Sequence, residues 1–182
     1  LLRHGRIDED LLRTWTAELI PLCEQITQFR RQYLSALSGQ LNQAISAFEG
    51  LGEVSLEYYC GWDEERSLAD VYIADQARDI GTKTTSHGAH RADIRIKVDG
   101  QAAADHLSRG QTKLLVYALK LAQASHYREH TGESCLFLLD DLPAELDYQH
   151  RGQVISYLND LGCQYFITGV DKKDFEDLVQ TV

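Results

Sequence analysis

The chain has no methionine at all and only two prolines among its 182 residues. No apolar run approaches the ~20 residues that cross a bilayer, and charged residues interrupt the segment Leu1 to Asp10, where a signal peptide would be apolar. These absences argue against a membrane or secreted protein, so we expect a cytoplasmic location and no membrane partner. The missing methionine also makes us expect a piece of a longer protein.

Cysteine is scarce and scattered. Cys23, Cys60, Cys135 and Cys163 are far apart, form no CxxC pair and fall mostly within apolar surroundings. This spacing suggests neither a zinc site nor a disulfide framework. We expect all four to be small core residues.

Positive charge is also in short supply, because the formal net charge is −10. Binding of a phosphate backbone depends on clustered lysine and arginine. We therefore expect any nucleic-acid-binding surface of this chain to be local or missing. The 43% apolar content is enough for one domain with a core and an extended appendage.

A long apolar stripe runs through the first part of the chain. Its spacing of three and four residues predicts one long helix over Leu11–Phe48, typical of an antiparallel coiled-coil arm, so residues 1–49 form a helical arm segment. Pro21 lies inside it, where we expect a kink or a break. A pair of ordinary bundle helices stays the alternative. The stripe consists of Trp15, Leu19, Leu22, Ile26, Phe29, Tyr33, Leu37, Leu41, Ile45 and Phe48.

The composition changes after Gly52. Alternating apolar residues predict strands at Val54–Cys60 and Ile94–Val98, the second followed by an Asp99-Gly100 turn. Between them, Asp63–Ile80 has the pattern of a charged helix with a few apolar residues facing inward.

The last part of the chain alternates helices and strands. A helix to about His126 is apolar over most of its circumference and must be well buried. The apolar run Cys135–Leu139 predicts a strand covered on both faces. A helix over Val154–Leu161 and a strand at Tyr165–Thr168 follow, which calls for a parallel pair. Residues 50–182 therefore form an α/β lobe with a parallel-strand core.

Two adjacent carboxylates, Asp140 and Asp141, end the apolar strand. Such a pair is costly at the mouth of a buried strand unless something positive or proton-accepting uses it. In nucleotide hydrolysis one carboxylate holds Mg²⁺ and its neighbour orients the attacking water. The alternative is that both side chains simply project into solvent.

A second short motif stands at the start of the buried helix. Ser108, followed three residues later by Gln111, fits a capping box, which needs no further function. The same serine, with Gly110 and a helix N-terminus, would also form a receptor for a terminal phosphate. The motif consists of Leu107, Ser108, Arg109, Gly110 and Gln111.

Together these elements resemble the ABC-type ATPase heads. Leu107–Gln111 is similar to their LSGGQ signature, Cys135–Asp141 to their Walker B strand and Ala144–Asp147 to their D-loop. The spelling is closest to the RecF family, in which Gly88–Asp93 resembles the GPHRAD segment with Ala89 in place of proline. The D-loop residues are Ala144, Glu145, Leu146 and Asp147.

Two features depart from the family pattern. No GxxxxGK[ST] occurs, so the P-loop, or Walker A motif, is absent from this chain. Because the family has its P-loop before the arm, we expect a C-terminal part whose N-terminal lobe lies elsewhere, inactive as an ATPase by itself. In addition, Thr168 follows Ile167 where ABC ATPases often have a switch histidine.

The resemblance implies a mechanism and partners. Two heads of the intact ATPase would form a homodimer around ATP, with Asp140 as the Mg²⁺ ligand through water and Asp141 as the catalytic carboxylate. Ser108, Gly110 and Gln111 would reach the ATP of the other subunit, and Asp147 would communicate between the sites. The family's biology implies binding of double-stranded and junction DNA, the mediators RecR and RecO, and indirectly RecA in recombinational repair.

Two other classes of function stay open. The chain could be an interaction module with a degenerate, non-hydrolysing ATPase-like lobe. An ABC transporter head is disfavoured because the long helical stripe at Leu11 to Phe48 has no counterpart of similar length there.

Overall fold

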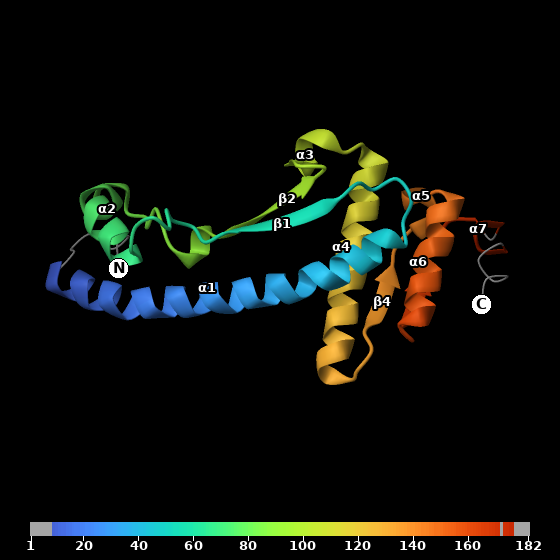
Figure 1. Ribbon diagram of the computed structural model, residues 1–182, viewed down its shortest axis with the longest axis horizontal. Helices are drawn as coiled ribbons and strands as arrows, with labels where there is room; N and C mark the ends of the chain where they lie inside the picture. The colour runs from blue at the N-terminus through green and yellow to red at the C-terminus, as the bar shows by residue number, and fades with distance from the viewer. Residues whose placement is uncertain (1–8, 172, 177–182) are drawn as a thin grey trace. The chain divides into compact units, whose positions relative to one another are not determined.

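The computed structural model describes residues 9–171 and 173–176, and it shows a mixed α/β chain (Figure 1). The chain divides into two compact units. Residues 1–34 and 57–95 belong to the first unit, and residues 35–56 and 96–182 belong to the second. The predicted division at residue 49 is a different one and stays a prediction.

Helix α1 (Glu9–Ser46) begins in the first unit and continues through Pro21 without a break. Pro21 itself is exposed to solvent. A proline removes one backbone hydrogen bond, and the helix is continuous on both sides of this one despite the loss. The predicted long helix is confirmed, and the break at Pro21 is not found.

The predicted apolar stripe divides between two environments. Leu37, Leu41 and Phe48 are buried, as the stripe predicts. The preceding part is exposed, and a different set of α1 residues, including Cys23 and Leu34, forms the packed face. The exposed residues are Leu11, Trp15, Leu19, Leu22, Ile26, Phe29 and Tyr33.

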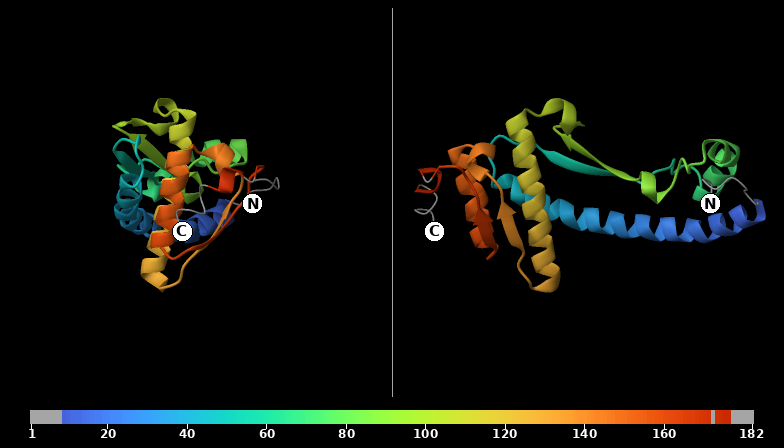
Figure 2. Two further views of the ribbon diagram at one scale, coloured as in Figure 1. Left: turned by 90° about the vertical axis from the view of Figure 1, so that its right-hand side faces the viewer. Right: turned by 180° about the vertical axis from the view of Figure 1, so that it is seen from behind.

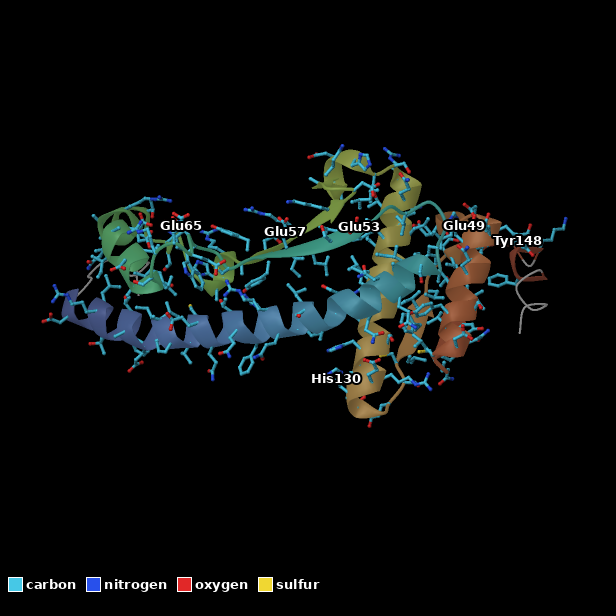
Figure 3. All side chains as sticks on the ribbon, in the orientation of Figure 1. Glu49, Glu53, Glu57, Glu65, His130 and Tyr148 are labelled. Atoms are coloured by element: carbon cyan, nitrogen blue, oxygen red, sulfur yellow. The ribbon has the colours of Figure 1, made fainter. Side chains whose placement is uncertain are left out.

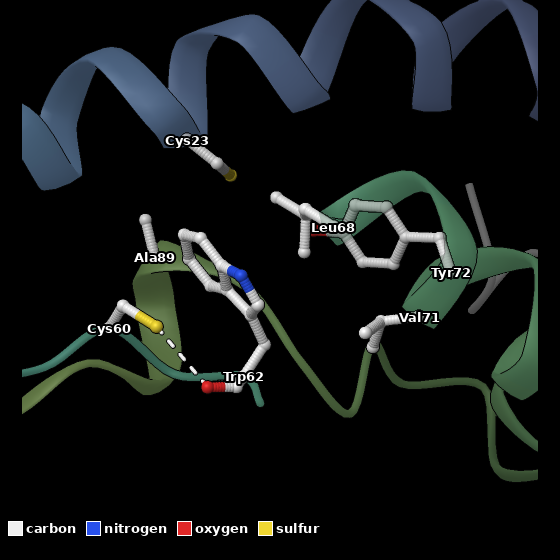
Figure 4. Packing of buried hydrophobic residues seen from close by; sticks show 7 residues of the cluster. All are labelled: Cys23, Cys60, Trp62, Leu68, Val71, Tyr72 and Ala89. Atoms are coloured by element: carbon white, nitrogen blue, oxygen red, sulfur yellow. Dashed lines mark hydrogen bonds between the residues drawn. The ribbon is translucent and has the colours of Figure 1, made fainter. Parts of the chain in front are cut away.

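The core of the first unit packs around Trp62 (Figure 4). Helix α2 (Leu68–Thr82) starts at Ser67, whose side chain accepts a hydrogen bond from the backbone N–H of Asp70. This N-cap sets a later start than the predicted Asp63. A few apolar residues face inward, as the sequence pattern predicts, because Leu68 and Val71 are buried. The cluster comprises Cys23, Cys60, Trp62, Leu68, Val71, Tyr72 and Ala89.

Strands β1 (Val54–Tyr59), β2 (Asp93–Val98) and β3 (Gln101–Ala102) form one sheet in that order. β2 and β3 are antiparallel, with Val98 opposite Gln101. The predicted Asp99-Gly100 turn joins them, and both residues have positive φ, 49° and 78°, as a two-residue hairpin requires. A short helix, η2 (Ala89–Arg91), precedes β2.

The second unit contains the predicted parallel pair. Strands β4 (Leu136–Leu139) and β5 (Gln164–Ile167) are parallel, with Leu136 opposite Gln164 and Leu139 opposite Ile167 (Figure 2). The helices of this unit that follow the sheet of β1–β3 are α3 (Ala103–His106), α4 (Arg109–Thr131), α5 (Leu142–Glu145), α6 (Tyr148–Asp160) and α7 (Lys173–Glu176). Helices α4 and α6 contact each other.

One face of the β4–β5 pair is exposed, which contradicts the prediction of a strand covered on both faces. Leu139 is buried, whereas the side chains of Leu136, Leu138 and Phe166 are 57%, 74% and 56% exposed. Alternate residues of a strand point to opposite faces. The apolar run identified a strand correctly, but among the described residues its second face has no covering layer.

Two of the four cysteines are core residues, as predicted. Cys23 and Cys60 are buried, whereas Cys135 and Cys163 are partly exposed. Among the described residues, no helix combines the length and apolar character needed to cross a membrane.

Candidate nucleotide-binding motifs

The signature residues Leu107–Gln111 lie at the N-terminus of α4. Ser108 is the N-cap: its hydroxyl accepts a hydrogen bond from the Gln111 backbone N–H at 3.3 Å. Gln111 returns the contact, because its side-chain oxygen accepts from the Ser108 backbone N–H at 3.0 Å. The predicted capping box is therefore present, and it fixes the serine at the start of a long helix.

The signature is open to solvent. Ser108, Arg109 and Gly110 are exposed. A Cβ atom built on Gly110 would meet no atom within 4 Å outside the neighbouring backbone, so internal packing does not explain this glycine. The first N–H groups of a helix lack partners within the helix and carry partial positive charge. The motif thus has the chemistry to receive an anion.

The two residues after β4, Asp140 and Asp141, share one hydrogen-bond partner, Thr168. Its hydroxyl donates to Asp140 Oδ1 at 2.5 Å and accepts from the Asp141 backbone N–H at 2.8 Å. Its own backbone N–H donates to the carbonyl of Leu139 at 3.0 Å. Asp141 has the positive φ of 50°, unusual for a residue other than glycine. Thr168 therefore fixes the turn that presents both carboxylates.

This arrangement fits a magnesium ion of the kind that accompanies a nucleotide. Mg²⁺ in such sites is bound through one or two carboxylates, with phosphate oxygens and water completing the shell. Asp140 is exposed and commits one oxygen to Thr168, which leaves the other available. Among the described residues, no group of three or more metal-ligating side chains forms a site that would hold a metal without a nucleotide.

The D-loop residues Ala144–Asp147 run from the end of α5 to the start of α6. Arg151 binds this segment from α6: its Nε donates to the carbonyl of Leu146 and its guanidinium to the carbonyl of Pro143, both at 2.7 Å. Lys113, on α4 just after the signature, forms an ion pair of 2.9 Å with Glu145. The D-loop is thus attached to both helices.

Asp147 is the N-cap of α6. It accepts from the His150 backbone N–H at 3.0 Å and contacts the His150 ring Nδ1 at 2.7 Å. The backbone N–H and then the ring hold the pKa of Asp147 below its usual value. Burial acts to lower the pKa of His150, but the bonds to Asp147 and to the Glu49 carbonyl outweigh it and raise that pKa.

The structure brings the predicted residues together in part. Asp140 and Asp141 meet at Thr168, and the D-loop contacts the signature helix through Lys113. Within the part of the chain that the structure describes, no hydrogen bond or ion pair joins Leu107–Gln111 to either carboxylate.

Sequence reasoning missed four residues of this region. Lys113 pairs with Glu145, which is distant along the chain, so no local pattern reveals that contact. His150 and Arg151 lie within a few residues of Asp147 and Leu146, and an N-cap at Asp147 is the local signal that could have placed them. Thr168 was noticed only as a departure from a switch histidine. Its position directly after β5, parallel to β4, is the signal that could have placed it beside Asp140.

A separate cavity of about 290 Å³ lies in the first unit. Arg30, Tyr33, Tyr58 and Ile94 are among its lining residues. Arg30 also donates to the carbonyl of Ala89 at 2.6 Å. None of the predicted site residues lines this cavity.

Comparison with known proteins gives a consistent family. The family model described as RecF/RecN/SMC N terminal domain matches residues 5–182. A DNA replication and repair protein RecF from Cellvibrio japonicus (strain Ueda107) is 44% identical over 173 residues, 95% of this chain and 47% of the relative. One from Azotobacter vinelandii (strain DJ / ATCC BAA-1303) is 44% identical over 170 residues, 93% of this chain and 46% of the relative.

Two solved structures of RecF share the fold. The recombination mediator protein RecF-ATP in the RecFOR pathway has a TM-score of 0.76 at 23% identity, over 94% of this chain and 48% of that chain. The RecF-ATPrS structure has a TM-score of 0.77 at 28% identity, over 94% of this chain and 47% of that chain. These likenesses confirm the predicted α/β fold of an ABC/SMC-type head.

The chain spans about half the length of the curated relatives it matches. The matching family model is described as an N terminal domain. That description does not support our expectation that the chain is a C-terminal part.

Proposed function

The chain belongs to the RecF/RecN/SMC family, and on that premise we propose that it contributes to an ATP-dependent dimerising head of a DNA repair protein. ATP would lie between two subunits, and its hydrolysis would release the dimer. This clamp would bind double-stranded or junction DNA and support recombinase loading with RecR and RecO.

The exposed signature is the observation that supports this proposal most. Ser108 is held at the helix start by the capping box, and the open space beside Gly110 leaves its backbone accessible. A γ-phosphate approaching from outside would meet the serine hydroxyl and the partial positive charge of the helix. Because the signature makes no bond to the carboxylates of its own chain, we propose that it serves the ATP of the partner subunit.

Asp140 and Asp141 would take different roles at the other half of that site. We assign Asp140 to Mg²⁺, held through water, because it is exposed and commits only one oxygen to Thr168. Magnesium supplies charge neutralisation on the phosphates when ATP is bound. We assign Asp141 to orienting the attacking water, since Thr168 fixes it through its backbone N–H rather than through its carboxylate.

The exposed stripe on α1 supports an arm. From Trp15 to Tyr33 its large apolar residues follow steps of four and three, the spacing of a coiled-coil seam. Monomers rarely leave such a long apolar stripe in water. We propose that another helix of the longer protein covers it, in keeping with the predicted arm.

ATP-dependent dimerisation of the full-length protein tests the proposal. Ser108→Arg places a bulky side chain at the helix start and should abolish dimerisation measured by light scattering, while nucleotide binding persists. Gln123→Arg, an exposed position on the same helix, is the matched control and should dimerise as wild type does. If Ser108→Arg dimerises normally, the signature is only a helix cap and the interaction-module alternative gains.

A further inference from the structure

Three side chains converge on the turn that follows α1, at Glu49 and Gly50. Gln111 donates from its side-chain amide to the Gly50 carbonyl at 3.0 Å. His150 contacts the Glu49 carbonyl through Nε2 at 3.1 Å, and Gln149 donates to the Glu49 carboxylate at 3.0 Å. All of these residues belong to the second unit. Glu49 is labelled near Tyr148, the first residue of α6 (Figure 3).

Two of these contacts continue directly into the predicted motifs. The side-chain oxygen of Gln111 accepts from the Ser108 backbone N–H, so Gln111 alone links the turn to the signature serine. The other ring nitrogen of His150 contacts Asp147, so His150 alone links the turn to the D-loop aspartate. The oxygen and the nitrogen of the Gln111 amide each make one of these bonds, so the side chain joins the signature to the turn.

The His150 ring is bonded in a way that requires a proton. Its two partners, the Asp147 carboxylate and the Glu49 carbonyl, are both acceptors. A neutral imidazole has one N–H, so only the imidazolium donates to both at once. Asp147 on its own helix and Glu49 in the turn are the ionisable groups that act on the ring, and the raised pKa of His150 agrees with this geometry.

We propose that the Glu49–Gly50 turn positions the signature and the D-loop together, with Gln111 and His150 as the positioning residues. The role of this coupling in ATP binding rests on the proposed function, whereas its test needs no nucleotide. A displacement at the end of α1 would then reach Ser108 through Gln111 and Asp147 through His150. The two motifs would respond as one, and the link through His150 would weaken as the ring loses its proton.

Hydrogen exchange of the full-length protein without nucleotide tests the coupling. His150→Ala should speed exchange about two- to tenfold in the segment after Ser108, although His150 does not touch it. Gln111→Ala should do the same in the segment after Asp147. Tyr148→Ala, a 62% exposed side chain in the first turn of α6, is the matched control and should leave the signature segment unchanged.

The conservative variant His150→Gln separates positioning from simple disruption. A glutamine can donate to the Glu49 carbonyl but does not titrate, so the protection of the signature segment, measured as its exchange rate relative to the intrinsic rate at the same pH, should be restored and should not change with pH. In wild type, that protection should fall as the pH rises through the pKa of His150.

The outcomes are separable from those of the proposed function. If each variant changes exchange only beside its own site, the coupling is wrong, whatever ATP does. If the coupling appears but ATP fails to dimerise wild type, the proposed function is wrong and the coupling stands.

Discussion

The two units use their polar side chains differently. In the first unit a compact core surrounds Trp62, and polar groups mostly close local loops, as where Ser86 binds Asp79. In the second unit polar side chains at helix and strand ends bind the backbone of other elements, as Arg151, Thr168 and Gln111 do. The difference teaches that both units bury an apolar core, but only in the second do polar side chains connect separate elements and fix the predicted motifs.

The largest effect should come from the core of the first unit. Leu68 is 1% exposed, so Leu68→Ala should lower the free energy of unfolding by about 2–5 kcal/mol. Urea denaturation followed by Trp62 fluorescence, with Trp15→Phe as the common background, measures this unit. Ile73→Ala on the same helix is the control, because Ile73 is 73% exposed. Equal losses in the two variants would contradict the burial argument.

A smaller effect should follow in the second unit from Arg151→Met. The change removes charged hydrogen bonds to the carbonyls of Pro143 and Leu146, each partly buried, and should cost about 1.5–3 kcal/mol. Circular dichroism during urea denaturation measures it. Arg128→Met, which removes one exposed bond of 3.3 Å to the Asp160 carbonyl, should stay within about 0.5 kcal/mol. Similar losses in the two variants would mean that the Arg151 hydrogen bonds to Pro143 and Leu146 add no stability.

The smallest effect concerns the pH response of Asp147 and His150. The lowered pKa of Asp147 gives a stabilising contribution above its unfolded pKa, which is lost as the pH falls through the folded value. The raised pKa of His150 gives a stabilising contribution below its unfolded pKa, and this contribution is lost as the pH rises through the folded pKa. The charged pair therefore exists between these two pKa values.

NMR titration of the His150 ring checks this pair. Asp147→Asn retains a capping oxygen but removes the charge, so it should lower the pKa of His150. Asp105→Asn, an exposed carboxylate on α3, is the control and should leave that titration unchanged. No change with Asp147→Asn would show that the ion pair does not form.

Local chemistry explains what the sequence could predict. The capping box at Ser108, the Asp99-Gly100 hairpin and the parallel β4–β5 pair each follow from neighbouring residues or from strand order. The predicted strand that became β4 also placed Asp140 and Asp141 at a strand end.

The remaining features depend on contacts between distant residues. His150 reaches a carbonyl 101 positions away, and Gln111 reaches one 61 positions away, so no local pattern reveals either contact. The apolar run of β4 predicts a strand without saying how many faces are covered. The stripe of α1 has the same spacing whether it packs within the unit or remains exposed.

The central claim is that each ATP site combines the carboxylates of one subunit with the signature of the other. Mixing two full-length variants, Ser108→Arg and Asp141→Asn, tests it most directly. Each should be inactive alone as an ATPase, since every site lacks one half. In the mixture, a dimer of one variant with the other would have one intact composite site, so ATPase activity should appear that neither variant has alone. A mixture as inactive as its components would contradict the shared site.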